Sequence, residues 1–211
     1  MQEFFTQVLS NLKNTSLLEF IAVIAGIVSV WFSRKENIWV YPTGLINTII
    51  YIYICFTFDL IGEASVNFYY TVMSIYGWWV WARKDDEHRP LVHISFSNQK
   101  EWIQEIIFFL FFYVTLFFLI TYLKPNFPGA IPWADAFASA TAFTGMWLMA
   151  RKKVESWWWW IVTNIASIPL YYVKGLAFTS VYYVILLVMA IFGLLEWNKR
   201  ARRIRDEITL V

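Results

Sequence analysis

Charged residues and cysteine are both scarce in this sequence. Asp, Glu, Lys and Arg together make up 15% of the 211 residues, against about 25% in an ordinary soluble domain. The single cysteine, Cys55, excludes an internal disulfide. A net charge of +2 is too small to indicate a nucleic-acid partner, and we expect none. These shortages argue against a soluble enzyme, a secreted disulfide scaffold and a nucleic-acid-binding protein.

Motifs that hold cofactors or metals are missing as well. The chain has no Walker loop for nucleotide phosphates and no HExxH or CxxC metal motif. Its two histidines, His88 and His93, lie beside Asp85, Asp86 and Glu87 in a polar stretch, which is more typical of a solvated loop than of a metal site. We therefore expect a protein that is not an enzyme and that needs no cofactor and no metal.

Apolar residues dominate instead, at 59%, and aromatic residues reach 21% with 13 Trp. A helix needs about 20 mostly apolar residues to cross the hydrocarbon core of a lipid bilayer. Seven stretches meet or approach that length, so the sequence predicts an all-α integral membrane protein with seven transmembrane helices. These stretches are residues 17–33, 38–58, 63–82, 103–123, 134–150, 157–173 and 178–197.

The distribution of positive charge predicts the orientation of these helices. With seven spans, fourteen Lys and Arg residues fall on one side of the membrane and only Lys13, Lys124 and Lys174 on the other. Loops rich in Lys and Arg stay in the cytoplasm. We therefore expect a multi-pass protein of the bacterial cytoplasmic (inner) membrane, with its amino terminus outside and its carboxyl terminus in the cytoplasm.

The first and second halves of the chain resemble one another in sequence. Matching pairs at an offset of 116 are Trp31–Trp147, Gly77–Gly193 and Trp81–Trp197, and pairs at 117 are Arg34–Arg151 and Asn47–Asn164. Each half holds three helices and one linker helix lies between them, so both halves cross the membrane in the same direction. The prediction is a 3+1+3 arrangement, in which two parallel three-helix repeats are joined by a linker helix.

This arrangement divides the chain into five segments. The opening segment has apolar residues near helical spacing and is predicted to be amphipathic and to lie along the membrane surface. The linker helix is nearly featureless (IIFFLFFYVTLFFLI). The segments are residues 1–16, amphipathic; 17–82, first bundle; 83–132, cytoplasmic loop and linker helix; 133–197, second bundle; and 198–211, basic cytoplasmic tail.

Polar residues inside a membrane are unfavourable without partners, so Asn47 and Asn164 invite a functional interpretation. One alternative is that both amides join packed helices. The other is that both face a central cavity and hold a polar ligand. Trp160 lies four residues before Asn164, which places an indole and an amide on one helix face. Such a pair can stack on a flat ring and bond its substituent.

Further candidates surround this pair in the predicted helices. Asn67 and Tyr183 correspond between the halves and offer groups that bond ribose hydroxyls without bringing charge. We add Tyr51, Tyr70 and Trp39 as candidate binding residues. Tyr69 and Tyr182 are expected to act as anchors at the outer membrane interface.

Two prolines and three acids complete the candidates. Pro42 and Pro169 fall within the second helix of each half, where a proline gives either a hinge for gating or a static kink. Glu19, Glu63 and Asp135 lie near the outer ends of their helices. An acid near a helix start is favoured by the macrodipole, so capping is the preferred interpretation and ion coupling the alternative.

Three segments together resemble the Pnu vitamin transporters. They are IYGWWVW at residues 75–81, WAD at 133–135 and Trp160-x-x-x-Asn164. The resemblance runs from about Leu17 to Trp197 and implies a fold like the sugar transporters of the SWEET type. It also implies that Trp160 and Asn164 form the family's binding motif and that Asn67 is their polar partner. Thr71 departs from a glutamine expected in some members.

What the resemblance implies about activity is facilitated diffusion of nicotinamide riboside. A cytoplasmic kinase would then trap the nucleoside by phosphorylation. Aromatic rings can hold its cationic pyridinium without a carboxylate. The same argument serves thiamine, which is the runner-up substrate, and a riboflavin-type substrate ranks third. An ion-coupled transporter and a homo-oligomer both remain open.

Overall fold

The computed structural model describes residues 17–57, 61–126 and 128–209. The predicted amphipathic segment 1–16 lies outside these residues. Seven α-helices occur in the described part, one for each predicted stretch, and a short 3₁₀ helix follows the fourth. They are α2 (Leu17–Arg34), α3 (Val40–Thr57), α4 (Ile61–Ala82), α5 (Gln99–Leu123), η1 (Lys124–Asn126), α6 (Pro132–Ala150), α7 (Glu155–Val173) and α8 (Ala177–Thr209).

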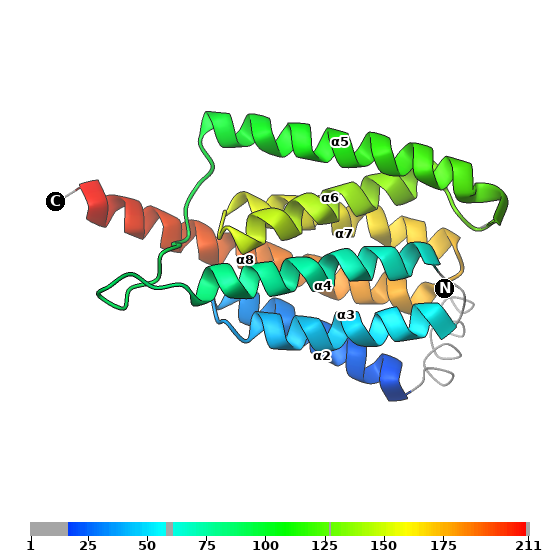
Figure 1. Ribbon diagram of the computed structural model, residues 1–211, viewed down its shortest axis with the longest axis horizontal. Coiled ribbons are helices and arrows are strands. Elements are labelled where there is room, and N and C mark those ends of the chain that lie inside the picture. The colour runs from blue at the N-terminus through cyan, green and yellow to red at the C-terminus, as the bar shows by residue number, and fades with distance from the viewer. Residues whose placement is uncertain (1–16, 58–60, 127, 210–211) are drawn as a thin grey trace.

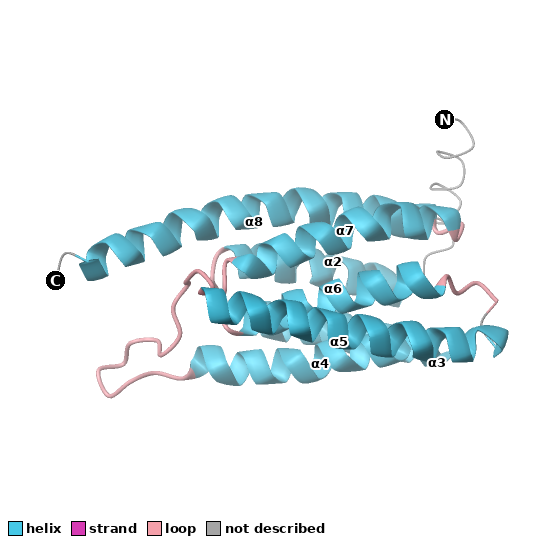
Figure 2. Ribbon diagram, turned by 90° about the horizontal axis from the view of Figure 1, so that it is seen from above, coloured by secondary structure: helices cyan, strands magenta, loops and turns pink. Residues whose placement is uncertain are grey.

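The helices lie side by side along one common direction (Figures 1 and 2). Helix α3 packs against both α2 and α4, and α7 packs against both α6 and α8. Between these two groups, α2 contacts α8 and α4 contacts α6. Helix α5 packs against α6 at the edge of the bundle. Each group thus touches the other through its first and third helices.

The last helix is longer than predicted. The sequence places its end at Trp197 and a basic tail after it, but α8 continues to Thr209 and extends past the bundle (Figure 1). The basic residues after Trp197 are therefore helical. An ion pair between Arg203 and Glu207, at 3.0 Å, is one of the i, i+4 contacts on this extension.

Three connections lie at the same end of the bundle, which we call the basic end. They are the turn at residues 35–39, the loop at 83–98 and the turn at 151–154. In the loop, Asp85 accepts hydrogen bonds from the backbone N–H groups of Arg89 and Glu87. The Arg89 bond is the main cause that lowers the pKa of the Asp85 carboxyl. Asn98 and Glu101 form a capping box that begins α5.

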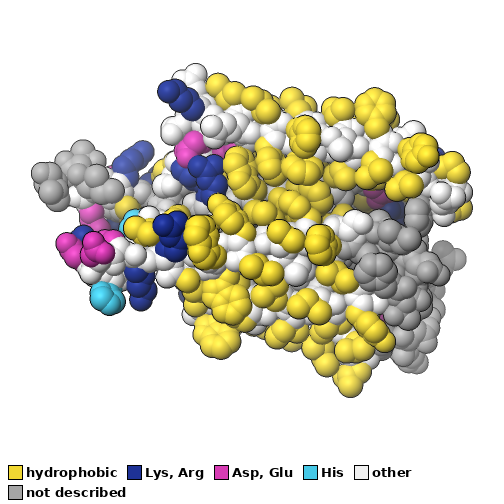
Figure 3. Space-filling model, viewed as in Figure 1, with side chains coloured by type: hydrophobic (Ala, Val, Ile, Leu, Met, Phe, Trp, Pro, Cys, Tyr) yellow, Lys and Arg dark blue, Asp and Glu magenta, His cyan; other side chains and the backbone are white. Residues whose placement is uncertain are grey.

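The surface of the bundle is apolar (Figure 3). Side chains such as Phe111 and Phe118 of α5 are exposed by 62% and 66%. Exposed apolar area of this extent is unfavourable in water and normal against lipid. Three described segments are long and apolar enough to cross a membrane: Leu17–Arg34, Gln99–Asn126 and Ala177–Glu207.

The contacts of the two groups repeat at an offset of 116. The indole N–H of Trp81 donates to the carbonyl of Ala150, and that of Trp197 to the carbonyl of Arg34. A Cβ at Gly77 would meet the Tyr41 ring, and one at Gly193 would meet the Trp157 ring. Trp197, Gly193 and Trp157 each follow their counterparts by 116 positions, and Arg34 precedes Ala150 by the same number. The pairs predicted at 117 are therefore wrong by one residue in the structure.

Candidate functional site

The indole of Trp160 on α7 lies inside the bundle. A Cβ at Gly145 of α6 would come within 3.2 Å of this ring, so the ring packs directly against the α6 backbone. The Tyr70 ring of α4 has its centroid 6.3 Å from that of Trp160. Two predicted candidates from opposite halves of the chain therefore meet here, with the Phe143 ring 6.2 Å from Tyr70.

Asn164 lies one turn further along α7, and the residue as a whole is 3% exposed. In the described part of the chain, no hydrogen bond joins its side-chain amide to another group. Its neighbour Thr163 is engaged, because the Thr163 hydroxyl donates to the Thr141 hydroxyl at 3.0 Å. Buried polar groups usually have partners. Asn164 therefore has donors and an acceptor available for a ligand.

Asn47 does not share this environment. Its Nδ2 donates to the carbonyl of Ala22 on α2 at 2.7 Å, close to the Cα of Gly26. At the structural offset of 116, the counterpart of Asn47 is Thr163, which likewise bonds the first helix of its own group. The counterpart of Asn164 is Thr48, whose hydroxyl accepts from Thr71. The amide nitrogen of Asn47 thus joins two packed helices, and the predicted equivalence with Asn164 is wrong.

We expect the Asn47→Ala change to lower stability and to leave ligand binding by the folded protein intact. The variant loses the hydrogen bond that joins α3 to the Ala22 carbonyl of α2, and a bond of this kind contributes about 0.5–1.5 kcal/mol. Thermal unfolding in detergent measures the loss. An unchanged melting temperature would contradict the assignment of Asn47 to helix packing.

Tyr69 and Tyr182 are not anchors at the membrane interface. The Tyr69 ring stacks on Phe143 with centroids 3.9 Å apart, and its hydroxyl donates to the Phe143 carbonyl at 3.1 Å. This contact joins α4 to α6. A Cβ at Gly26 of α2 would come within 2.5 Å of the Tyr182 hydroxyl, so Tyr182 joins α8 to α2. Both predictions are wrong, because the close approach of the two halves draws these rings inward.

The other candidates are only partly brought together. The Tyr183 ring stacks on Tyr171 of α7, with centroids 5.1 Å apart. Tyr51 and Asn67 are half-buried on α3 and α4. Trp39, in contrast, is 59% exposed in the turn at the basic end, so the structure does not bring it to Trp160.

The two prolines take different positions in their helices. Pro42 is the third residue of α3, where the missing N–H breaks no helical hydrogen bond. A static kink is therefore not expected at Pro42, and the hinge predicted there stays a prediction. Pro169 lies inside α7, four residues before its end at Val173. A hinge at Pro169 remains a prediction.

Of the three acids near helix starts, the structure describes the side chains of Glu19 and Asp135. Asp135 accepts a hydrogen bond from the backbone N–H of Ile131 at 2.7 Å and pairs with Lys174 at 2.5 Å. This is the capping role that the sequence favours. Glu19 has a polar contact as well, and the side chain of Glu63 lies outside the described residues.

Sequence analysis missed several residues at this site and near it. Phe143 and Gly145 belong to a stretch of α6 rich in small buried residues, and that composition is a usable signal for close helix packing. Glu105 is fully buried in the linker helix and accepts a hydrogen bond from the Trp159 indole at 3.1 Å. The linker helix is therefore not featureless.

The arrangement is suited to a flat polar ligand. Aromatic rings from α4, α6 and α7 lie together, and one turn along α7 lies Asn164, a buried residue whose amide has no partner among the described residues. A ring can stack on such side chains, and the amide can bond its substituents. A buried site of this kind in an apolar helical bundle is typical of a membrane transporter.

Comparison with known proteins supports this class and gives the family. Residues 16–199 match the family described as nicotinamide mononucleotide transporter, and the chain belongs to that family. It is a multi-pass membrane transporter and not an enzyme. The resemblance to the Pnu vitamin transporters is confirmed.

Curated relatives that align with most of this chain are named as transporters of vitamins. The nicotinamide riboside transporter PnuC of Escherichia coli (strain K12) is 24% identical and aligns with 89% of this chain and 87% of its own length. PnuC of Neisseria mucosa is 27% identical over 89% of this chain and 74% of its own. The riboflavin/roseoflavin transporter RibM of Streptomyces davaonensis is 23% identical over 88% and 86%.

A solved structure shares the fold. The crystal structure of the vitamin B3 transporter PnuC superimposes with a TM-score of 0.71, covering 95% of this chain and 88% of that one at 24% sequence identity.

Proposed function

We propose that the protein takes up nicotinamide riboside by facilitated diffusion. The observation that carries the proposal is the Trp160 ring beside Tyr70, with the unpaired amide of Asn164 one turn away. The pyridinium of nicotinamide riboside is flat and cationic, so ring faces attract it. The carboxamide of the ligand complements the donors and acceptor of Asn164. Two relatives that carry this substrate in their names support the choice.

The proposed architecture is two parallel three-helix repeats, α2–α4 and α6–α8, joined by α5. The contacts of α2 with α8 and of α4 with α6 support it, because a two-fold axis along the membrane normal exchanges these pairs. All seven helices then span the membrane. The basic end faces the cytoplasm, which places the amino terminus outside and the carboxyl terminus inside. A cytoplasmic kinase traps the nucleoside and keeps uptake running downhill.

Uptake into liposomes that contain the purified protein tests the proposal. We expect labelled nicotinamide riboside to enter without any proton or sodium gradient and to stop at equal concentrations on both sides. Accumulation that depends on an ion gradient would replace facilitated diffusion with ion coupling. Liposomes without protein are the control for leakage.

Competition in the same liposomes separates the candidate substrates. We expect unlabelled nicotinamide riboside to inhibit uptake at lower concentrations than thiamine or riboflavin. Riboflavin is included because RibM is among the relatives. Stronger binding of either competitor, measured by calorimetry on the purified protein, would change the assigned vitamin and leave the transport class intact.

A further inference from the structure

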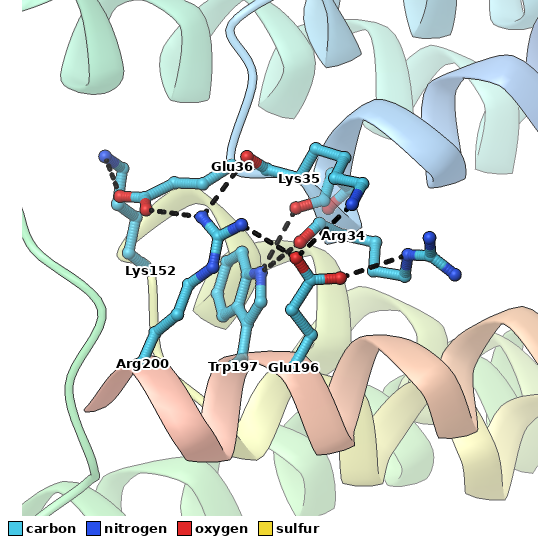
Figure 4. Close-up of polar contacts among 8 residues, drawn as sticks. Arg34, Lys35, Glu36, Lys152, Glu196, Trp197 and Arg200 are labelled. Carbon is cyan, nitrogen blue, oxygen red and sulfur yellow. Dashed lines mark hydrogen bonds and ion pairs between the residues drawn. The ribbon is translucent and has the colours of Figure 1, made fainter. Parts of the chain in front are cut away.

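Polar contacts between the two groups of helices gather at the basic end (Figure 4). Glu36, after α2, pairs with basic side chains of the second half, and Glu196 of α8 pairs with basic side chains of both halves. Glu36 pairs with Lys152 at 2.7 Å and with Arg200 at 3.3 Å. Glu196 pairs with Arg34 at 3.2 Å. These ion pairs bring together residues that are more than 110 positions apart in the sequence.

Two tryptophans make equivalent hydrogen bonds, each from one group of helices to a backbone carbonyl of the other group. Trp81 of α4 donates to the carbonyl of Ala150 at the end of α6, at 3.1 Å. Trp197 of α8 donates to the carbonyls of both Ser33 and Arg34 at the end of α2, each at 3.2 Å. Both indoles are buried, by 93% and fully. Each bond fastens the third helix of one group to the first helix of the other.

Another aromatic ring packs against each of these two indoles. The Tyr41 ring meets Trp81 edge to face at 5.2 Å and 85°, and the Trp157 ring meets Trp197 at 5.6 Å and 86°. Edge-to-face contacts of this kind are favourable for aromatic pairs. The two indoles therefore have fixed orientations, and both lie against the carbonyl that they bond.

Two further contacts join residues that are equivalent to one another. Ser33 donates to the sulfur of Met149 at 3.0 Å, and Lys152 donates to Glu36. Each pair is separated by 116 positions, so both lie where the two groups meet symmetrically. Glu36 and Lys152 also share a left-handed backbone, with φ of 57° and 53°. This conformation ends α2 and α6 in the same way and turns the two side chains toward one another.

We propose that these contacts form the gate of the transporter at its basic end, closed in this structure. We name the set Ser33, Glu36, Trp81, Met149, Lys152 and Trp197 the paired lock. This inference rests on the proposed function. The lock lies between the central residue Asn164 and the basic end of the bundle, and its bonds cross from one group of helices to the other. Passage of a substrate to that end requires the groups to separate there.

A cross-link between the two groups tests the need for separation. Ser33→Cys and Met149→Cys are combined in a Cys55→Ser background and joined by a short bifunctional methanethiosulfonate reagent, because the two native side chains are in contact, with the Ser33 oxygen 3.0 Å from the Met149 sulfur. We expect the cross-link, its formation verified by mass spectrometry, to reduce transport in liposomes at least tenfold, with substrate binding retained and transport restored by reduction. Full transport by the cross-linked protein would overturn the proposal.

A second measurement needs no substrate, so it stays informative even if the proposed vitamin is wrong. Ser33 is 4% exposed, so in a Ser33→Cys variant made in the same Cys55→Ser background a membrane-impermeant maleimide reaches the thiol only when the lock opens. We expect Trp81→Phe and Trp197→Phe each to speed labelling from the basic side about threefold or more, because each removes the indole donor and keeps a ring. Unchanged labelling in both variants would overturn the proposal.

The matched control is Trp79→Phe on the same helix. Trp79 is 58% exposed and lies under the guanidinium of Arg83, within its own half of the chain. We expect the maleimide to label the Ser33→Cys protein at the same rate with and without the Trp79→Phe change. Acceleration by Trp79→Phe equal to that by Trp81→Phe would indicate general loosening and would also overturn the proposal.

Discussion

The Asn164→Ala variant should bind nicotinamide riboside about tenfold to a hundredfold more weakly than the parent protein. The amide is buried and has no partner among the described residues, so its hydrogen bonds are available to the ligand. Loss of these bonds leaves the carboxamide of the ligand unpaired in a buried site, which costs about 1–3 kcal/mol, and each 1.4 kcal/mol is tenfold in affinity. Calorimetry on the purified variant measures the change.

Two comparisons make this result specific. Asn47→Ala removes an amide from a neighbouring helix, but that amide already bonds Ala22, so binding by the folded protein should persist. Trp160→Phe keeps a ring beside Tyr70 and should retain more affinity than Trp160→Ala. Equal affinity in the Asn164→Ala and parent proteins would show that the ligand contacts another face of α7.

The Gly77→Ala and Gly193→Ala variants should each lose about 5 °C or more in melting temperature. A Cβ at either position would come within 2.5 Å of a buried ring, from Tyr41 or from Trp157. Overpacking of this kind costs about 1–3 kcal/mol, which corresponds to several degrees in a chain of this length. Because the two contacts are equivalent, the two losses should be similar.

Gly129→Ala provides the matched control, because a Cβ there would meet nothing within 4 Å. We expect its melting temperature to stay within about 1 °C of the parent, as for most surface substitutions. Thermal unfolding in one detergent compares all three variants. A Gly77→Ala protein as stable as Gly129→Ala would show that the Tyr41 ring moves aside without cost.

The lack of charge and the long apolar stretches were sufficient to predict the helices. Each of the seven stretches contains a helix in the described structure, because twenty apolar residues in a row satisfy their backbone polar groups only within a helix in lipid. The spacing of Trp160 and Asn164 also predicted their common face, since residues four apart on a helix lie one above the other.

The register of the repeat required the tertiary structure. Aligning Asn47 with Asn164 shifts the match by one residue, and one residue turns a helix by about 100°. That error changes which neighbour each side chain meets. In the shifted alignment Asn47 is a candidate for contact with the ligand, whereas its amide nitrogen bonds the Ala22 carbonyl. The identity of the residues alone does not distinguish an offset of 116 from one of 117.

The sequence by itself determined the membrane class, the helices and the common face of Trp160 and Asn164 on α7, because these depend on composition and on local helical geometry. Only the tertiary structure decided that Tyr69 turns to Phe143 and that Glu105 pairs with Trp159. It alone revealed the reciprocal bonds of Trp81 and Trp197. The physical reason is that a buried polar group takes the partner nearest in space, and that partner is set by how separate helices approach.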